Sequence, residues 1–430
     1  MESLKIMVKF VTPLFCSCFL LSSITLLDIV HSAKECDFPA IFNFGDSNSD
    51  TGGLASAFPA YLSPPYGETY FHEPAGRFSD GRLMIDFIAK SFDLPYLNAY
   101  LDSLGTKHKQ GANFATAAST IRLPSRIIPA GGFSPFYLDI QYTQFVRLKS
   151  KHRETTRNQD ETLSEDEYFH KALYTFDIGQ NDLGEGFFSN KSVQEVNQSV
   201  PDIVNSFSTN FKRSKLEKAS VDPIPHRPKH PHPPLMRSGA RGSFWIHNTG
   251  PIGCLPYILA NFPSAERDEA GCAKPFNEVA KYFNYVLLNA VTKLRREFPL
   301  AAITYVDVYK VKYSLFTDPH KYGFELPLVA CCGYGGEYNY SDSVGCGGTI
   351  TVNGTQIFVG SCGEASVRVD WDGVHYTEAA NKWSYYNTNG PNLEQELPHG
   401  DKLPQSRGQP NKSGLIVTLH TFGMSCTWEE

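Results

Sequence analysis

Two short motifs near opposite ends of the chain contain the residue types that nucleophilic catalysis needs. Residues 45–50 read Gly-Asp-Ser-Asn-Ser-Asp and follow an apolar run at 39–44 that is typical of a buried strand. Residues 371–375 read Trp-Asp-Gly-Val-His. A serine hydroxyl becomes a good nucleophile when a histidine takes its proton and a carboxylate fixes the histidine tautomer. These groups have to meet only in space, so Ser47, Asp372 and His375 predict a serine ester hydrolase.

The serine motif alone is weak evidence, because Gly, Asp and Ser also favour ordinary turns. The Gly-x-Ser-x-Gly elbow of another hydrolase class is absent, since Ser49 stands where its second glycine would be. The assignment of Ser47 therefore depends on the rest of the chain.

Short apolar runs alternate with longer helical patterns along the sequence. The expected strands are Ala40–Phe44, Ala112–Thr116, Leu173–Ile178, Phe244–His247 and Ile303–Val308. The expected helices are Leu83–Ser91, Asp139–Lys149, Val193–Phe211 and Glu269–Glu297. This alternation predicts an α/β fold with a parallel sheet between helix layers. Ser47, Asn181 and Thr249 each follow an expected strand, so one rim at the carboxyl ends of the strands can hold all three.

Four ordered motifs carry a family resemblance. They are Gly-Asp-Ser-Asn-Ser-Asp-Thr-Gly at 45–52, Gly-Ala-Asn-Phe-Ala at 111–115, Ile-Gly-Gln-Asn-Asp at 178–182 and Asp-Gly-Val-His at 372–375. They resemble blocks I, II, III and V of the plant GDSL esterase/lipase family, within the SGNH hydrolases. Residues 78–82 and 244–256 also resemble plant members, above all the early-nodulin-8-like branch. The resemblance implies a flavodoxin-like three-layer α/β/α sandwich with a mostly parallel sheet.

The resemblance also implies a role for each motif residue. Ser47 is the expected nucleophile, His375 the general base and acid, and Asp372 the group that orients His375. The expected oxyanion hole consists of the backbone N–H groups of Ser47 and Ala118 and the side chain of Asn181. The family usually has glycine at position 118. Alanine keeps the N–H, but its methyl group matters if the position requires a positive φ.

These residues predict a carboxylester hydrolase that works through an acyl-serine intermediate, with no metal and no cofactor. Its ester substrate stays open among lipids, acetylated polysaccharides and small acetylated metabolites. Two alternatives remain: a wall glycoprotein that binds glycan without catalysis, and an acyltransferase that uses the same triad.

The N-terminus has the pattern of a secretory signal, which we expect to span residues 1–33. Lys5 and Lys9 precede an apolar stretch at 10–27, and small residues follow at Ser32 and Ala33. A membrane anchor is the alternative, but a spanning helix needs about 20 apolar residues, and polar residues at 22, 23 and 25 interrupt this one. No later segment is apolar enough to span a bilayer. We therefore expect a secreted protein, either extracellular or in the cell wall.

Cysteines and sequons agree with secretion. Two of the 10 cysteines, at 16 and 18, lie in the signal, which leaves 10 − 2 = 8 for disulfides. Cys254 with Cys272 is one expected pair, and the cysteines at 331, 332, 346 and 362 form a second pool whose pairing the sequence leaves open. Zinc binding is the weaker alternative because adjacent cysteines lack the usual spacer. Expected glycosylation sites are Asn190, Asn197, Asn339, Asn353 and Asn411.

Charge and local composition complete the domain plan. The formal net charge of −6 argues against nucleic-acid binding. We expect one hydrolase domain at 34–383, interrupted by a basic, proline-rich insert at about 212–241, and a loosely ordered tail at 384–430. Both stretches depart from the family pattern, and we hypothesise that they come from a retained intron or a shifted reading frame.

Overall fold

The structure is a computed structural model that describes residues 37–58, 62–102, 108–128, 132–156, 165–212 and 242–388. Five strands form its main sheet: β1 (Ile41–Gly45), β2 (Gly111–Asn113), β3 (Leu173–Asp177), β4 (Gly242–His247) and β5 (Ala301–Val306). Every pairing is parallel, and the strand order is β2-β1-β3-β4-β5. This is the flavodoxin-like order, so the predicted α/β/α sandwich is confirmed.

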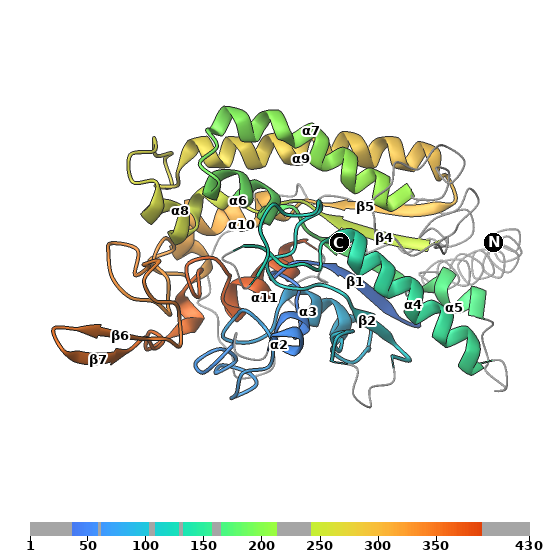
Figure 1. Ribbon diagram of the computed structural model, residues 1–430, viewed down its shortest axis with the longest axis horizontal. Helices are drawn as coiled ribbons and strands as arrows, with labels where there is room; N and C mark the ends of the chain where they lie inside the picture. Colours follow the sequence, from blue (N-terminus) through green and yellow to red (C-terminus); the bar gives the residue numbers. More distant parts are fainter. Residues whose placement is uncertain are drawn as a thin grey trace, which may run out of the picture. The chain divides into compact units, whose positions relative to one another are not determined.

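Helices cover both faces of this sheet (Figure 1). In chain order they are α2 (Gly53–Ala57), α3 (Met84–Ser91), α4 (Leu138–Thr156), α5 (Glu165–Lys171), α6 (Gln180–Phe188), α7 (Val193–Lys212), α8 (Pro256–Asn261), α9 (Lys274–Glu297), α10 (Val308–Thr317) and α11 (Glu378–Thr388). Helices α7 and α9 lie side by side on one face, while α3 and α11 pack together on the other. None of the helices in the described ranges combines the length and the hydropathy that a bilayer-spanning segment needs.

The expected helix at 269–297 begins five residues late. Its first turn is at Lys274 because the preceding residues form a tight turn of their own. Asp268 accepts hydrogen bonds from the backbone of Ala270 and Cys272, and Gly271 has a φ of 80°. Pro275 then lies in the first turn of α9, where its missing N–H costs nothing.

An aromatic layer fills the space between the sheet and the helices α4, α5 and α7. Alternate residues of a strand face the same side, so Phe42 and Phe44 of β1 both point into this layer. Phe44 stacks on Phe176 of β3 with ring centroids 5.0 Å apart. At the far end of α7, Phe211 contacts Phe244 of β4 at 5.2 Å. The end of α7 at Lys212 and the start of β4 at Gly242 therefore lie near each other.

In the described ranges of the chain, three disulfides lie outside the main sheet. Cys254 pairs with Cys272, as expected, and the second pool resolves into Cys331–Cys362 and Cys332–Cys346. The second pool encloses a hairpin of β6 (Thr349–Val352) and β7 (Thr355–Phe358). The hairpin is drawn at the left of Figure 1, away from the strands of the main sheet.

Several predicted segments fall outside the described residues. They are the signal at 1–33, positions 213–241 of the insert and positions 389–430 of the tail. Residues 384–388 of the expected tail belong to α11, which ends at Thr388.

Candidate active site

Ser47 lies in a turn directly after β1, and only 5% of its surface is exposed. The neighbours of β1 are β2 and β3, so the strand order reverses at this point. Ligands of open α/β sheets bind at such a switch point, at the carboxyl ends of the strands. Two backbone hydrogen bonds shape the turn: Asp46 N–H donates to the Asp177 carbonyl at 3.1 Å, and Ser49 N–H donates to the Asp46 carbonyl at 3.1 Å.

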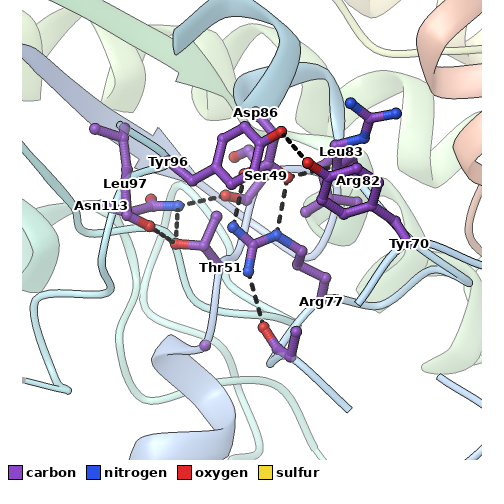
Figure 2. A network of polar contacts seen from close by, with 12 residues as sticks. Ser49, Thr51, Tyr70, Arg77, Arg82, Leu83, Asp86, Tyr96, Leu97 and Asn113 are labelled. Carbon is purple, nitrogen blue, oxygen red and sulfur yellow. Dashed lines mark hydrogen bonds and ion pairs between the residues drawn. The ribbon is translucent and has the colours of Figure 1, made fainter. Parts of the chain in front are cut away.

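Asn113, at the end of β2, fixes the far side of this turn. Its side-chain nitrogen donates to the Ser49 carbonyl at 2.6 Å and to the Thr51 hydroxyl at 2.9 Å (Figure 2). Asn43 of β1 in turn donates to Asn113 Oδ1 at 2.8 Å. The turn that carries Ser47 is therefore held by side chains that project from two adjacent strands.

Asp50 connects the serine turn to the segment after β2. Its carboxylate accepts from Gly52 N–H at 2.8 Å, Leu54 N–H at 3.0 Å and Ala117 N–H at 2.7 Å. Burial raises the pKa of Asp50, and these backbone donors oppose the rise. One buried carboxylate thus fixes the start of α2 and the residue just before Ala118.

Ala118 is half-buried and has a φ of 60°. Its carbonyl accepts from Ser134 N–H at 2.9 Å, whereas its own N–H has no acceptor among the described residues. The N–H of Ser47 is likewise without an acceptor in the described part of the chain. Both N–H groups are therefore free to donate a hydrogen bond to a ligand.

Asn181 lies in the first turn of α6, after β3. Its side-chain nitrogen donates to the Ser119 carbonyl at 2.9 Å, which uses one of its two hydrogens. The next residue, Asp182, accepts from Ile121 N–H at 2.7 Å and Arg122 N–H at 3.3 Å. Burial raises the pKa of Asp182 to about 7. The two side chains of α6 thus brace the segment that begins at Ala118.

Asp372 and His375 form a direct pair. The Nδ1 atom of His375 lies 2.7 Å from Asp372 Oδ2, while the backbone N–H of His375 donates to Asp372 Oδ1 at 2.9 Å. Burial would raise the pKa of Asp372, but the adjacent imidazole and the hydrogen bonds hold that pKa below its usual value. This contact occupies Nδ1 of His375 and leaves Nε2 without a partner among the described residues.

A closed loop creates that pairing. Trp371 N–H donates to the His375 carbonyl at 2.7 Å, which joins the two ends of the loop. At its tip Gly373 has a φ of 100°, and a side chain there would come within 2.2 Å of the Tyr340 ring. Glycine is therefore required between Asp372 and His375 for both conformation and space.

Ser47 and His375 are not joined by a hydrogen bond in the described structure. Phe78 packs beside the imidazole, with ring centroids 5.2 Å apart, and it also packs, as Ala118 does, against the buried cluster of Leu54, Ala117 and Ile128. Catalytic hydrogen bonds are often long in a ligand-free site and tighten when substrate binds.

Two other polar residues after or within β4 belong to the core. His247 is buried, its Nδ1 lies 3.1 Å from the Phe176 carbonyl, and burial lowers its pKa. Thr249 N–H donates to Asn284 Oδ1 at 2.9 Å. The sequence places Thr249 near the rim, but the contacts of both residues are internal.

The sequons differ in accessibility. Asn190 and Asn353 are exposed, whereas Asn197 and Asn339 are half-buried. The Asn339 amide also donates to the Ala330 carbonyl at 3.0 Å. Asn411 lies outside the described residues.

Replacement of Ala118 by glycine is expected to stabilise the protein. A left-handed backbone costs an alanine about 1 kcal/mol relative to glycine, so the free energy of unfolding should rise by about that amount. The backbone N–H is retained, and ester turnover should stay within about twofold. Chemical denaturation measures the difference.

Ala115→Gly is the matched control for this change. Ala115 lies in the same segment without a positive φ, so glycine there should lower stability by about 0.5–1 kcal/mol. Equal destabilisation by both variants would contradict the claim that Ala118 is strained.

Spacing along the sequence does not reveal every residue that shapes this site. Tyr66 donates its hydroxyl to Asp372 Oδ2 at 2.8 Å across more than 300 residues of chain. Gln141 of α4 binds both the N–H and the carbonyl of Gly45, at 2.9 and 2.8 Å. The one usable signal for Tyr66 is its position in a Pro-Pro-Tyr-Gly turn, which indicates a rigid loop but not its partner.

Comparison with known proteins places these residues in context. A family model described as GDSL-like Lipase/Acylhydrolase matches residues 41–385. The chain is 58% identical over 365 residues to an esterase of Hevea brasiliensis, covering 84% of this chain and 87% of that protein. It is 57% identical over 357 residues to GDSL esterase/lipase ENOD8 of Medicago truncatula, covering 82% and 86%. It is 46% identical over 380 residues to alpha-L-fucosidase 3 of Arabidopsis thaliana, covering 87% and 96%.

Proposed function

Because the chain belongs to the GDSL-like lipase/acylhydrolase family and is a carboxylic ester hydrolase, we propose that Ser47, His375 and Asp372 are its catalytic triad. The single observation that carries this proposal is the 2.7 Å contact between His375 Nδ1 and Asp372 Oδ2. It fixes the imidazole in the tautomer that has its free lone pair on Nε2.

The reaction proceeds in two halves. Ser47 Oγ attacks the ester carbonyl carbon as His375 Nε2 takes the hydroxyl proton. The tetrahedral intermediate then collapses, and Nε2 returns the proton to the departing alcohol, which leaves an acyl-serine. Water attacks the acyl carbon as Nε2 takes a proton from it; the bond to Ser47 Oγ then breaks as Nε2 returns that proton to Oγ, and the carboxylic acid is released. Asp372 stabilises the imidazolium in both halves.

The oxyanion of each intermediate needs donors that are already in place. We assign this role to the N–H groups of Ser47 and Ala118 and the second side-chain hydrogen of Asn181. All three follow parallel strands at one edge of the sheet, and none is used by another described residue. A single such donor typically contributes about 100- to 1000-fold in rate.

Glycoside hydrolysis is suggested only by the name of the Arabidopsis relative. That chemistry generally uses a pair of carboxyl groups across the scissile bond. The serine, histidine and aspartate of this site favour acyl transfer to water, and we therefore propose lipids, acetylated polysaccharides or small acetylated metabolites as substrates.

We also propose that the mature protein is secreted and glycosylated. The N-terminal pattern at 1–33, the three disulfides and the exposed sequons Asn190 and Asn353 support this. The hydrolase domain would then extend over 34–383, with the insert and the tail as additions to it.

A fluorophosphonate probe tests the triad directly. The mature protein should hydrolyse a chromogenic short-chain ester, and the probe should block turnover by modifying Ser47. Peptide mass spectrometry locates the adduct, and a nitrophenyl fucoside run in parallel should give no product. Inhibition with the adduct on a different residue would refute the assignment of Ser47.

A further inference from the structure

We propose that Tyr66 is a positioning residue for hydrolysis, which acts through Asp372 and does not touch the substrate. The inference rests on the proposed roles of Asp372 and His375. The Tyr66 hydroxyl donates to Asp372 Oδ2 at 2.8 Å, and this is the oxygen that His375 Nδ1 meets at 2.7 Å. The carboxylate oxygen that orients the imidazole is therefore itself fixed by a second donor.

The Tyr66 ring has little freedom to move. Only 8% of the residue is exposed, and its ring meets those of Trp371 and Phe78 edge-on at 6.1 and 6.0 Å. Trp371 is fully buried, and its carbonyl accepts from Cys332 N–H at 2.6 Å. The disulfides of Cys331 and Cys332 anchor this cluster. The packed aromatic rings thus hold the Tyr66 hydroxyl against Asp372.

The loop from Tyr66 to Arg82 also contacts the chain on the other side of His375. Gly67 N–H donates to the Ser79 carbonyl at 3.0 Å, and the Ser79 hydroxyl donates to the Tyr376 carbonyl at 3.0 Å. Asp80 Oδ1 accepts from Glu378 N–H, at the first turn of α11, at 2.7 Å. One loop therefore contacts both sides of His375. It holds Asp372 through Tyr66, and it holds Tyr376 and Glu378 through Ser79 and Asp80.

The charges around Asp372 decide what the hydroxyl does chemically. Besides His375, the titratable groups of the described segments that face Asp372 are Tyr66, Tyr340 and the buried Asp370. Burial and the charge of Asp372 raise the pKa of Tyr66, so the phenol stays protonated and acts as a donor. Its hydrogen bond draws negative charge away from the carboxylate. Without it, Asp372 would stabilise a protonated imidazole more strongly.

Tyr66→Phe removes this hydroxyl and keeps the ring packing. We expect kcat for a chromogenic ester to fall about tenfold, because a hydrogen bond to a charged group is lost and the acid–base pair is less well oriented. KM should change by less than about twofold. Since a protonated imidazole cannot act as a base, the acid limb of the kcat/KM profile should move to higher pH.

Tyr174→Phe is the matched control. Tyr174 is also buried, with 5% of its surface exposed, and its hydroxyl donates to the Phe169 carbonyl at 2.9 Å in the aromatic layer. This variant loses a buried hydrogen bond of similar length without touching Asp372. It should keep the wild-type kcat and acid limb, and thermal melting should show both variants folded.

Asp372→Asn separates the two ways in which the inference can fail. If Asp372→Asn loses activity while Tyr66→Phe matches Tyr174→Phe in kcat and acid limb, the role of Tyr66 is overturned and the triad stands. If Asp372→Asn keeps wild-type activity, the proposed function fails and the inference falls with it.

Discussion

Ser47→Ala is expected to lower kcat/KM for a chromogenic ester by about 10⁴- to 10⁶-fold. Loss of a serine nucleophile removes the covalent pathway, and the oxyanion donors and substrate binding alone supply only a small residual rate. The variant should fold normally, because no other described residue bonds the Ser47 hydroxyl. Steady-state kinetics measures the loss, and the fluorophosphonate probe should no longer label the protein.

Ser49→Ala is a matched control within the same turn. Ser49 is equally buried, and its hydroxyl has no partner among the described residues. The contact that matters is made by its backbone carbonyl, which alanine retains. We expect turnover and labelling close to wild type. If Ser49→Ala were as inactive as Ser47→Ala, the turn as a whole and not one hydroxyl would be responsible.

Asp86→Ala is expected to reduce the free energy of unfolding by about 3–5 kcal/mol, because it leaves a buried guanidinium group unpaired. Asp86 is fully buried at the start of α3, and both its oxygens accept from Arg77, at 2.6 and 2.8 Å (Figure 2). One of them also accepts from Leu83 N–H at 2.9 Å, so the replacement also leaves this backbone N–H at the start of the helix without its acceptor. Chemical denaturation checks the size of the loss.

Two further variants make this result specific. Glu278→Ala breaks an exposed ion pair with Lys281 on α9, and the free energy of unfolding should change by less than about 0.5 kcal/mol. The double replacement of Arg77 by Met and Asp86 by Leu removes both buried charges. It should be more stable than Asp86→Ala alone, since no charge is left unpaired. A double variant as unstable as the single one would show that packing, not charge, explains the loss.

The sheet was predictable because its strands are short apolar runs, although β2 ends at Asn113 and β5 at Val306, before the expected ends at 116 and 308. All five expected strands occur, and the four expected helices occur with shifted bounds. The short helices α2, α5, α6, α8 and α10 were not expected, since a helix of few turns has too few residues to establish a period. Helix α9 shows the opposite limit: its period was visible, but the turn made by Asp268 that delays its start depends on side-chain hydrogen bonds.

Some residues of the site could be predicted from their neighbours in sequence, and others depend on contacts between distant parts of the chain. Motif residues such as Ser47, Asn181 and His375 could be proposed from the sequence because their neighbours in the chain carry the pattern. The φ of 60° at Ala118 was raised as a question by the residue type, and the backbone supplies the answer. Tyr66 and Phe78 were not identified, because their contacts with Asp372 and His375 cross about 300 residues of chain. No periodicity links such positions.

The contact between Phe211 and Phe244 has a consequence for how this gene can change. Because the two ring centroids are 5.2 Å apart, the end of α7 and the start of β4 lie close together in space. The entropic cost of closing a loop rises only slowly with its length. Extra residues inserted between α7 and β4 should therefore change the free energy of unfolding very little. Splicing errors or exon gains should therefore survive here more often than at the turns after β1 or β3, where each added residue would displace Ser47 or Asn181.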